Sequence, residues 1–543
     1  MKKIFYSVFA FVSIALTSCI GDVENINPQQ TSEADYDAIF NKVYATFVLT
    51  GQVGPSDDGD LIGLDEGRSQ YTRMLWNLNE LTSDEAHWYW YQNDAGYEDL
   101  VQNTYGADNA VSSGLFYRLF FNITLCNNYL TNVPDGSATD LTNRKNEVRF
   151  IRAFFYWSLI DLFGNGPFSD KFEVGTGGEY KTRAELFTYV ESELKDLAEV
   201  LPAAGSQTYG RVDQVAAWMM LSRIYLNAEV YTGTARWAEA KEWAAKVINN
   251  GYYKLLTTGK NGYTPYQLLF MADNDTNGAQ YEDIFPILHN GTDIKSYGGM
   301  HALILGNYSA NMSTIVPSGT GNSWGKCATI KGRLADIFFG NAETDGKLTD
   351  LNAAYTLANN DQRALIINVC GEDKYTRYVE TQGDQTQGYC CVKFRNVRSD
   401  GGSVSPEAAD GYVDTDYPLL RIAEAYLNYA EADARINGGA TTADGGQKIN
   451  ALRNRANATI YKTDGAGYTL EEIRDEWAKE FWFEGRRRID LVRFGCFGGQ
   501  SSYKWEWMGN AAGGNQFAAF RNIFGIPNSE ITINTAIKQN EGY

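Results

Sequence analysis

Residues 212–248 read VDQVAAWMMLSRIYLNAEVYTGTARWAEAKEWAAKVI and contain two amphipathic stretches that meet at Thr232-Gly233. In each stretch apolar residues recur every three or four positions, as along one face of an α-helix. Small residues such as Ala217 and Ala240 allow two helices to approach closely. Two helices in about 34 residues are typical of a tetratricopeptide-like hairpin, which buries its apolar faces by stacking on neighbouring hairpins.

The same periodicity extends to both sides of this hairpin. Apolar stripes cover residues 115–130 and 148–163 before it, and another covers 419–430 after it. Thr469 and Glu472 have the spacing of a capping box, which marks the start of one more helix. The sequence therefore predicts a helical scaffold along most of the chain.

The pattern divides the chain into consecutive parts of one compact body. A polar tether covers 19–35, a helical part 36–250 and a second helical part 416–543. Between them, residues 251–415 are rich in Gly, Asn, Thr and Asp and lack strong periodicity. Long irregular segments inside a helical protein commonly carry binding loops, so we expect the binding site to draw on this part.

Composition narrows the class of partner. The chain has 543 residues and a net charge of −20, which repels nucleic acid and anionic membrane surfaces. It has only three histidines, the residue that general-base and zinc chemistry favour. Aromatic residues make up 14% of the chain, so it is rich in flat amphipathic side chains suited to stacking on a neutral polar ligand.

The first residues have the pattern of an export signal. Lys2 and Lys3 precede an apolar stretch at 4–16, which is too short to span a bilayer. Small residues then stand directly before Cys19, as in a bacterial lipoprotein signal. We predict a signal peptide at 1–18 and a lipidated Cys19 that tethers the mature protein, rather than an ordinary signal with an incidental cysteine.

Several motifs lack the context that their chemistry needs. Residues 321–325, GNSWG, match the hydrolase pattern G-x-S-x-G, but every histidine precedes Ser323 and the required order is not met. The triplet at 486–488, Arg-Arg-Arg, stands beside several acids and is interpreted as a structural ion-pair cluster. The remaining cysteines form no CxxC pair, and the oxidation state of Cys390 and Cys391 stays open.

A polar segment at 273–278 matches the first half of a calcium-binding loop. Asp273, Asp275 and Asn277 occupy the first three ligand positions, and glycine follows at the sixth. The twelfth position is Ile284, where a bidentate glutamate is expected. Two alternatives remain: a bound, structural calcium ion with ligands completed from elsewhere in the chain, or a polar turn without a metal. No other cofactor is expected.

An aromatic and polar cluster has the composition of a sugar site. Three tryptophans and two tyrosines fall between residues 76 and 91, with Arg73 before them and Asn93 after them. Tyr297 and Trp324 stand in Gly-rich surroundings in the irregular part. Sugars present C–H faces to aromatic rings and hydroxyls to polar groups, so this combination favours carbohydrate binding.

Three segments carry a resemblance to a known family. They are 477–495 (WAKEFWFEGRRRIDLVRFG), 418–427 (PLLRIAEAYL) and 452–456 (LRNRA). With them the chain resembles the SusD/RagB family of glycan-binding outer-membrane lipoproteins. The resemblance implies an all-α, SusD-like fold with four tetratricopeptide-like hairpins and a variable glycan face. It also implies a lipid-anchored protein on the cell exterior, lying as a lid on a TonB-dependent transporter of the SusC type.

Within that family, the chain resembles the starch-binding founder in particular. This resemblance implies that Trp88, Tyr297 and Trp324 form an aromatic arc for an α-glucan, and that Asp65, Arg73 and Asn93 bind its hydroxyls; we expect Trp88 and Trp324 to supply most of the stacking. The implied function is non-catalytic binding of starch oligosaccharides. A receptor for another neutral glycan and, in a different class, a glycoside hydrolase remain as alternatives.

Overall fold

Helices form the framework of the protein. A computed structural model describes residues 33–543 except 52–53, 56–58, 66, 68, 136–138 and 173–177. The predicted signal peptide, Cys19 and nearly all of the tether lie outside the described residues. Within the described part of the chain, no helix combines the length and the apolar character that a bilayer span requires.

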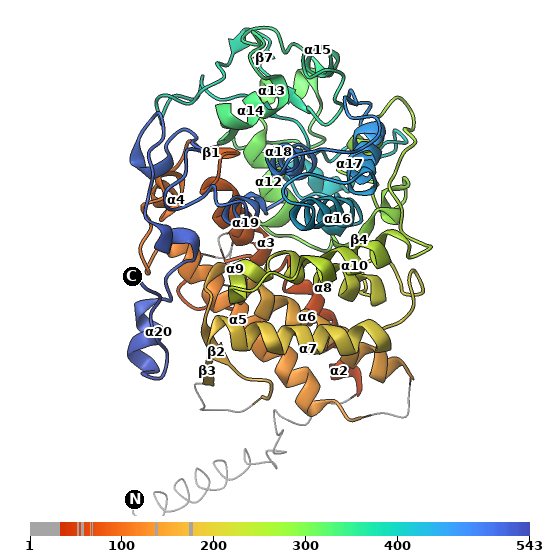
Figure 1. Ribbon diagram of the computed structural model, residues 1–543. Helices are drawn as coiled ribbons and strands as arrows, with labels where there is room; N and C mark the ends of the chain where they lie inside the picture. Colours follow the sequence, from red (N-terminus) through yellow and green to blue (C-terminus); the bar gives the residue numbers. More distant parts are fainter. Residues whose placement is uncertain are drawn as a thin grey trace, which may run out of the picture.

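Most of the N-terminal helices lie in the lower and middle parts of Figure 1, and α4 lies higher, beside β1. Their bounds are α2 (Glu33–Ala45), α3 (Tyr71–Trp76), α4 (Tyr97–Gln102), α5 (Ala110–Asn132), α6 (Thr139–Leu162), α7 (Arg183–Val200), α8 (Gln214–Leu226), α9 (Ala228–Thr232) and α10 (Trp237–Ile248). Helix α5 packs on α6, α6 on α7, α7 on α8, and α8 on α10. The π-helical turn η2 (Asn77–Leu81) continues α3.

The hairpin predicted at 212–248 is present. Helix α9 ends at Thr232, and Gly233 follows with a φ of 75°, which only glycine adopts without strain. Helices α8 and α10 pack together, and Ser222 Oγ donates a hydrogen bond of 2.9 Å to the carbonyl of Ala240. The number of four such hairpins stays a prediction.

The C-terminal helices return to this stack. They are α16 (Ala423–Ile436), α17 (Ala443–Arg455), α18 (Leu470–Phe481), α19 (Arg487–Arg493) and α20 (Asn528–Ile533). Helix α16 packs on α10, nearly two hundred positions earlier in the chain, and the two lie one above the other in Figure 1. The capping box of Thr469 and Glu472 is confirmed at the start of α18.

One predicted boundary is wrong. The stripe at 419–430 is helical only from Ala423, because Leu419 belongs to strand β10 (Tyr417–Arg421). This strand pairs with β4 (Asp283–Ile287) in antiparallel register, with Tyr417 opposite Ile287. A partner strand far away in the sequence therefore overrides the local helical period.

Short elements form most of the regular structure in residues 251–415. The helices are α11 (Pro265–Leu268), α12 (Gly299–Asn307), α13 (Ala310–Ile315), α14 (Gly332–Phe339) and α15 (Leu351–Leu357). The other strands in this part are β5 (Ala328–Ile330), β6 (Ile366–Ile367), β7 (Val369–Cys370), β8 (Asp373–Lys374) and β9 (Cys390–Cys391). Strands β1 (Ala86–Trp88), β2 (Gly166–Phe168) and β3 (Glu179–Lys181) precede it. In the described residues these strands form only two-stranded pairs, among them β1 with β5, so the fold is helix-rich.

A buried network of ion pairs holds the C-terminal helices to the rest. Arg421 Nη1 lies 2.9 Å from Glu480 of α18 and 3.0 Å from Glu282, and Arg455 of α17 pairs with the same two glutamates. The interpretation of the arginine triplet as structural is confirmed, because Arg487 Nε lies 2.8 Å from Asp84 and both side chains are buried.

Candidate functional site

A surface cleft of about 390 Å³ opens where α3, β1 and the loops before α12 and β5 meet. Its lining residues are Asp65, Gly67, Arg73, Trp88, Trp90, Asp94, Tyr297, His301, Leu305, Asn322, Trp324 and Asp410. Five of the six residues predicted to bind glycan are in this set. The exception is Asn93, which is exposed on the turn after Trp90 and donates its backbone N–H to the Trp90 carbonyl over 2.9 Å.

Arg73 is fixed at the centre of the cleft. Its Nη1 donates to the carbonyls of Gly67 at 2.6 Å and Tyr297 at 3.0 Å, and its guanidinium carbon lies 5.3 Å from the centre of the Trp324 ring. A cation over an indole face is an attractive contact. Arg73 therefore joins three segments that are remote in the sequence and holds two of the predicted aromatic side chains in place.

The aromatic side chains differ in how much ring surface they offer. Tyr297 and Trp324 are half-buried, and Trp90 is half-buried beside them. Trp88 is only 3% exposed, since its Nε1 donates to Asp94 over 2.7 Å and its strand pairs with β5. Trp88 therefore presents a smaller stacking face than we expected from the sequence.

Two further aromatic side chains contact the rings of the predicted arc. The ring of His301 lies 5.3 Å from Tyr297, 5.6 Å from Trp324 and 5.2 Å from Tyr412. Tyr412 also stacks on Tyr297 at 6.1 Å. Burial lowers the pKa of His301 to about 3, so its imidazole is neutral at ordinary pH.

Sequence reasoning missed Trp90 as a cleft residue, together with Asp94, His301, Leu305, Asn322 and Asp410. Trp90 was visible in the aromatic run, but neither its sequence position nor its neighbours distinguished it from a core residue. Asp94 and Asn322 stand close in the sequence to Asn93 and Trp324, but no local pattern marked them. The tertiary fold brings His301, Leu305 and Asp410 to the cleft.

The charges of the cleft favour a neutral ligand. The lining contains the carboxyl groups of Asp65, Asp94 and Asp410 and a single cationic side chain, Arg73. An anionic glycan would meet net negative charge there, as it would on the rest of this acidic protein. Hydroxyl groups, by contrast, donate to carboxylates and accept from guanidinium groups.

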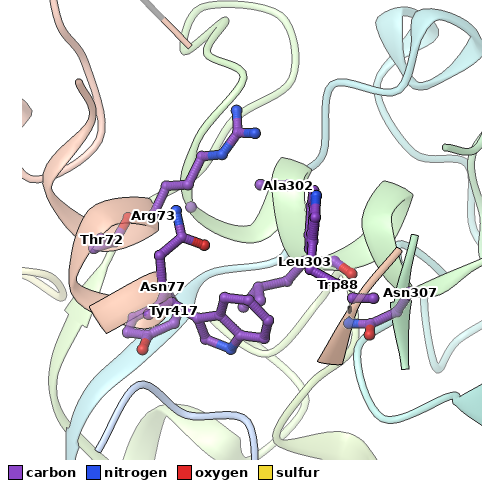
Figure 2. Close-up of a pocket in the computed structure, with 11 residues that line it drawn as sticks. Thr72, Arg73, Asn77, Trp88, Ala302, Leu303, Asn307 and Tyr417 are labelled. Atoms are coloured by element: carbon purple, nitrogen blue, oxygen red, sulfur yellow. Dashed lines mark hydrogen bonds between the residues drawn. The ribbon is translucent and has the colours of Figure 1, made fainter. Parts of the chain in front are cut away.

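A small enclosed cavity of about 10 Å³ lies behind the cleft, room for about one water molecule. Figure 2 shows Thr72, Arg73 and Asn77 on one side of it and Trp88 and Asn307 on the other. The Arg73 guanidinium points away from this cavity. Trp88 therefore forms a wall between the enclosed space and the open cleft.

The candidate calcium ligands are engaged with the protein itself. Asp273 accepts hydrogen bonds from the backbone N–H and the hydroxyl of Ser399, at 2.9 and 2.6 Å. Asn277 Nδ2 donates to the carbonyl of Leu268 at 2.9 Å, and Asp275 is exposed. Over the residues that the structure covers, no cluster of three or more His, Cys, Asp or Glu side chains is arranged to hold a metal. These contacts are those of a polar turn, and bound calcium stays a prediction.

The cysteines of the described residues are free thiols. All six are buried, and the adjacent Cys390 and Cys391 occupy strand β9 beside β6. Burial raises the pKa of Cys391 to about 12, which keeps this thiol protonated.

The fold and the cleft together define a helix-rich binding protein with a cleft suited to a neutral ligand. Comparison with known proteins shows that the chain belongs to the SusD family. The SusD family profile matches residues 369–543, and a profile described as "starch-binding associating with outer membrane" matches residues 22–226. The starch-binding protein SusD of Bacteroides thetaiotaomicron is 37% identical over an alignment that covers 100% of this chain and 99% of that protein.

The chain is also similar to more distant proteins. The SusD-like protein P25 of Formosa agariphila is 24% identical over 70% of this chain and 69% of its own. A SusD-like protein of Bacteroides fragilis superposes with a TM-score of 0.68 at 17% identity, covering 94% of this chain and 97% of its own. A laminarin-binding SusD-like protein superposes with a TM-score of 0.66 at 19% identity, covering 95% of this chain and 100% of its own. The prediction of a SusD-like, helical fold is confirmed.

Proposed function

We propose that this protein binds starch-type α-glucan at the cell surface and does not cleave it. The observation that carries the proposal is the arrangement of Trp324, Tyr297 and Arg73 around one cleft, in a chain 37% identical to a starch-binding protein. Half-buried rings stack on sugar faces, and Asp65 and Arg73 supply acceptors and donors for hydroxyls. A pre-formed arc selects the curved shape of an α-glucan at little ordering cost.

The same proposal includes a place in the cell and a partner. A lipidated Cys19 would anchor the protein in the outer membrane facing outward, and a SusC-like TonB-dependent transporter would receive the oligosaccharide. The profile described as associating with the outer membrane supports the location. Co-purification of the transporter with tagged full-length protein from native membranes, and its loss after Cys19→Ala, tests this part.

Affinity electrophoresis tests the glycan. We expect amylopectin in the gel to retard the mature protein, laminarin not to, and Trp324→Ala to abolish the retardation. Trp243→Ala is a matched control, because Trp243 is also half-buried but lies on α10, outside the cleft. Retardation by laminarin but not by amylopectin would show that the ligand is a β-glucan rather than starch. Reducing ends released from starch would show a hydrolase instead.

A further inference from the structure

Lys326 is a buried cation two residues after Trp324. Its side chain is 2% exposed, and Nζ donates to the carbonyls of Gln385 at 3.0 Å and Gln387 at 3.3 Å. The ammonium also lies 4.1 Å from the ring centre of Tyr375 and 4.9 Å from that of Tyr89. Two carbonyls and two aromatic faces therefore form a cage around one positive charge.

This cage contains no carboxylate partner. Lys326 makes no ion pair within 4.0 Å to any acid in the described ranges, although the whole chain carries a net charge of −20. Burying an ammonium group without a counter-ion costs free energy. An apolar residue at this position would avoid that cost. We therefore expect the charge to have a role other than stabilising the fold.

The cage connects two of the three tryptophans that line the cleft, Trp324 and Trp88. Trp324 donates its backbone N–H to Leu305 over 2.8 Å, and Lys326 donates its own to Tyr308 over 2.7 Å. Lys326 has a φ of 57°, an uncommon value for a residue with a side chain. That conformation directs the backbone out of the Trp324 loop and into strand β5.

On the other side of the cage, Tyr89 directly follows Trp88 in the chain. Its backbone N–H donates to the Cys327 carbonyl over 2.8 Å, and its hydroxyl donates to the carbonyl of Gln387. The Lys326 ammonium therefore contacts Tyr89, which follows Trp88 in the chain, and Lys326 itself is two residues after Trp324.

We propose that Lys326 is a positioning residue of the glycan cleft, whose protonated side chain aligns Trp324 and Trp88, so that glycan affinity falls when this proton is lost. The inference rests on the proposed function, since it concerns the same cleft. Loss of the positive charge removes the attraction to the two tyrosine rings and weakens the donation to both carbonyls.

The Lys326 ammonium group titrates near physiological pH. Burial lowers the pKa of Lys326 to about 8, opposed by Cys390 of β9, Cys370 of β7, Asp384 and Asp373 of β8. Tyr89 and Tyr375 themselves have raised pKa values because they are buried, so they stay neutral in this range. The histidines do not titrate there either: burial lowers the pKa of His87, His289 and His301 to about 4 or below.

Isothermal titration with maltoheptaose between pH 7 and 9.5 tests the inference. We expect wild-type affinity to fall roughly three- to tenfold across this range, as loss of a desolvated cation–π contact implies. Lys326→Met should bind that much more weakly at pH 7 and show no further dependence on pH.

Lys331→Met is the matched control. Lys331 is also fully buried with a pKa lowered to about 8 by burial, but its Nζ donates to the carbonyl of Ser83, away from the cage. This variant should keep the wild-type pH dependence. Equal pH dependence in wild type and Lys326→Met, or a flat profile in Lys331→Met, would overturn the inference.

Cys370 is a second group that could titrate in this range, because a hydrogen bond with the Cys390 thiol lowers the pKa of Cys370. It therefore needs a control of its own. Cys370→Ser should still lose affinity as pH rises, with the midpoint moved to lower pH because a negative neighbour of Lys326 is gone; a flat profile would assign the effect to the thiol. If Lys326→Met does not fold, the inference is tested by the pH profiles of wild type, Lys331→Met and Cys370→Ser, all three of which should lose affinity as the pH rises. If wild type binds no maltoheptaose at any pH, the proposed function fails instead.

Discussion

The guanidinium of Arg73 lies 5.3 Å from the centre of the Trp324 ring, and its Nη1 lies 3.0 Å from the carbonyl oxygen of Tyr297. Helix α3 therefore supplies the side chain that sets the spacing between two aromatic residues from the middle of the chain. The relationship makes Arg73 a structural clamp in the cleft, and it leads to the first prediction.

Replacing Arg73 by lysine should weaken maltoheptaose binding about tenfold. A lysine ammonium lacks the planar guanidinium, which lies over the Trp324 indole while its Nη1 donates to the carbonyls of Gly67 and Tyr297. Arg73→Met should be weaker still, because it also removes the donor. Isothermal titration measures the affinities. An Arg73→Lys protein that binds like wild type would show that the planar guanidinium is not required.

Gly67 should not tolerate a side chain. A Cβ at this position would lie 2.9 Å from the Cβ of Tyr297, so Gly67→Ala must displace Tyr297 or the loop. We expect a loss of several-fold in glucan affinity with a change in unfolding free energy of about 1 kcal/mol. Gly106→Ala is the control, since a Cβ there meets no atom within 4 Å. Equal effects of both changes on affinity would contradict this prediction.

Asp94 should act through Trp88. Asp94→Ala removes the acceptor of the Trp88 Nε1 hydrogen bond and leaves a buried donor unpaired, which costs about 1–3 kcal/mol. We expect a lower Tm and a red shift in tryptophan emission as the ring gains solvent. Trp88→Phe removes the N–H as well, so adding Asp94→Ala to it should cost little more. If Asp94→Ala lowers the stability of the Trp88→Phe protein as much as that of wild type, Asp94 stabilises the protein through contacts other than Trp88.

The buried network around Glu480 should govern acid stability. Burial raises the pKa of Glu480, but Arg455, Arg421 and Arg363 outweigh it and bring the pKa to about 2, below the ordinary value of 4.5. Between these pH values the unfolded chain binds the proton and the native protein does not. Stability from Glu480 is therefore complete above pH 4.5 and is lost as pH falls toward 2.

Glu480→Gln should lower the free energy of unfolding at pH 7 by about 3–5 kcal/mol and by less at pH 3, because it leaves buried arginines without a partner. Urea unfolding at both pH values measures this difference. Glu471→Gln on the same helix is the control: its carboxylate is 75% exposed, and we expect a change below about 0.5 kcal/mol. A loss at pH 3 as large as that at pH 7 would exclude the proposed linkage.

The sequence alone determined the helical framework and most of the candidate site. Periodicity located α5, α6 and the α8–α10 hairpin, because an amphipathic helix repeats its apolar face every 3–4 residues whatever it packs against. The capping box located the start of α18 for a similarly local reason. The resemblance carried by 477–495 indicated the family, and five of the residues it implied line one cleft.

The tertiary structure decided what depends on contacts between remote segments. Leu419 is in a strand because β4 pairs with it, and Trp88 is buried because Asp94 and β5 hold its ring. The cage around Lys326 unites residues of four separate segments, and no local pattern marks that lysine. Burial and pairing are properties of the assembled chain, so a single sequence without its fold does not contain them explicitly.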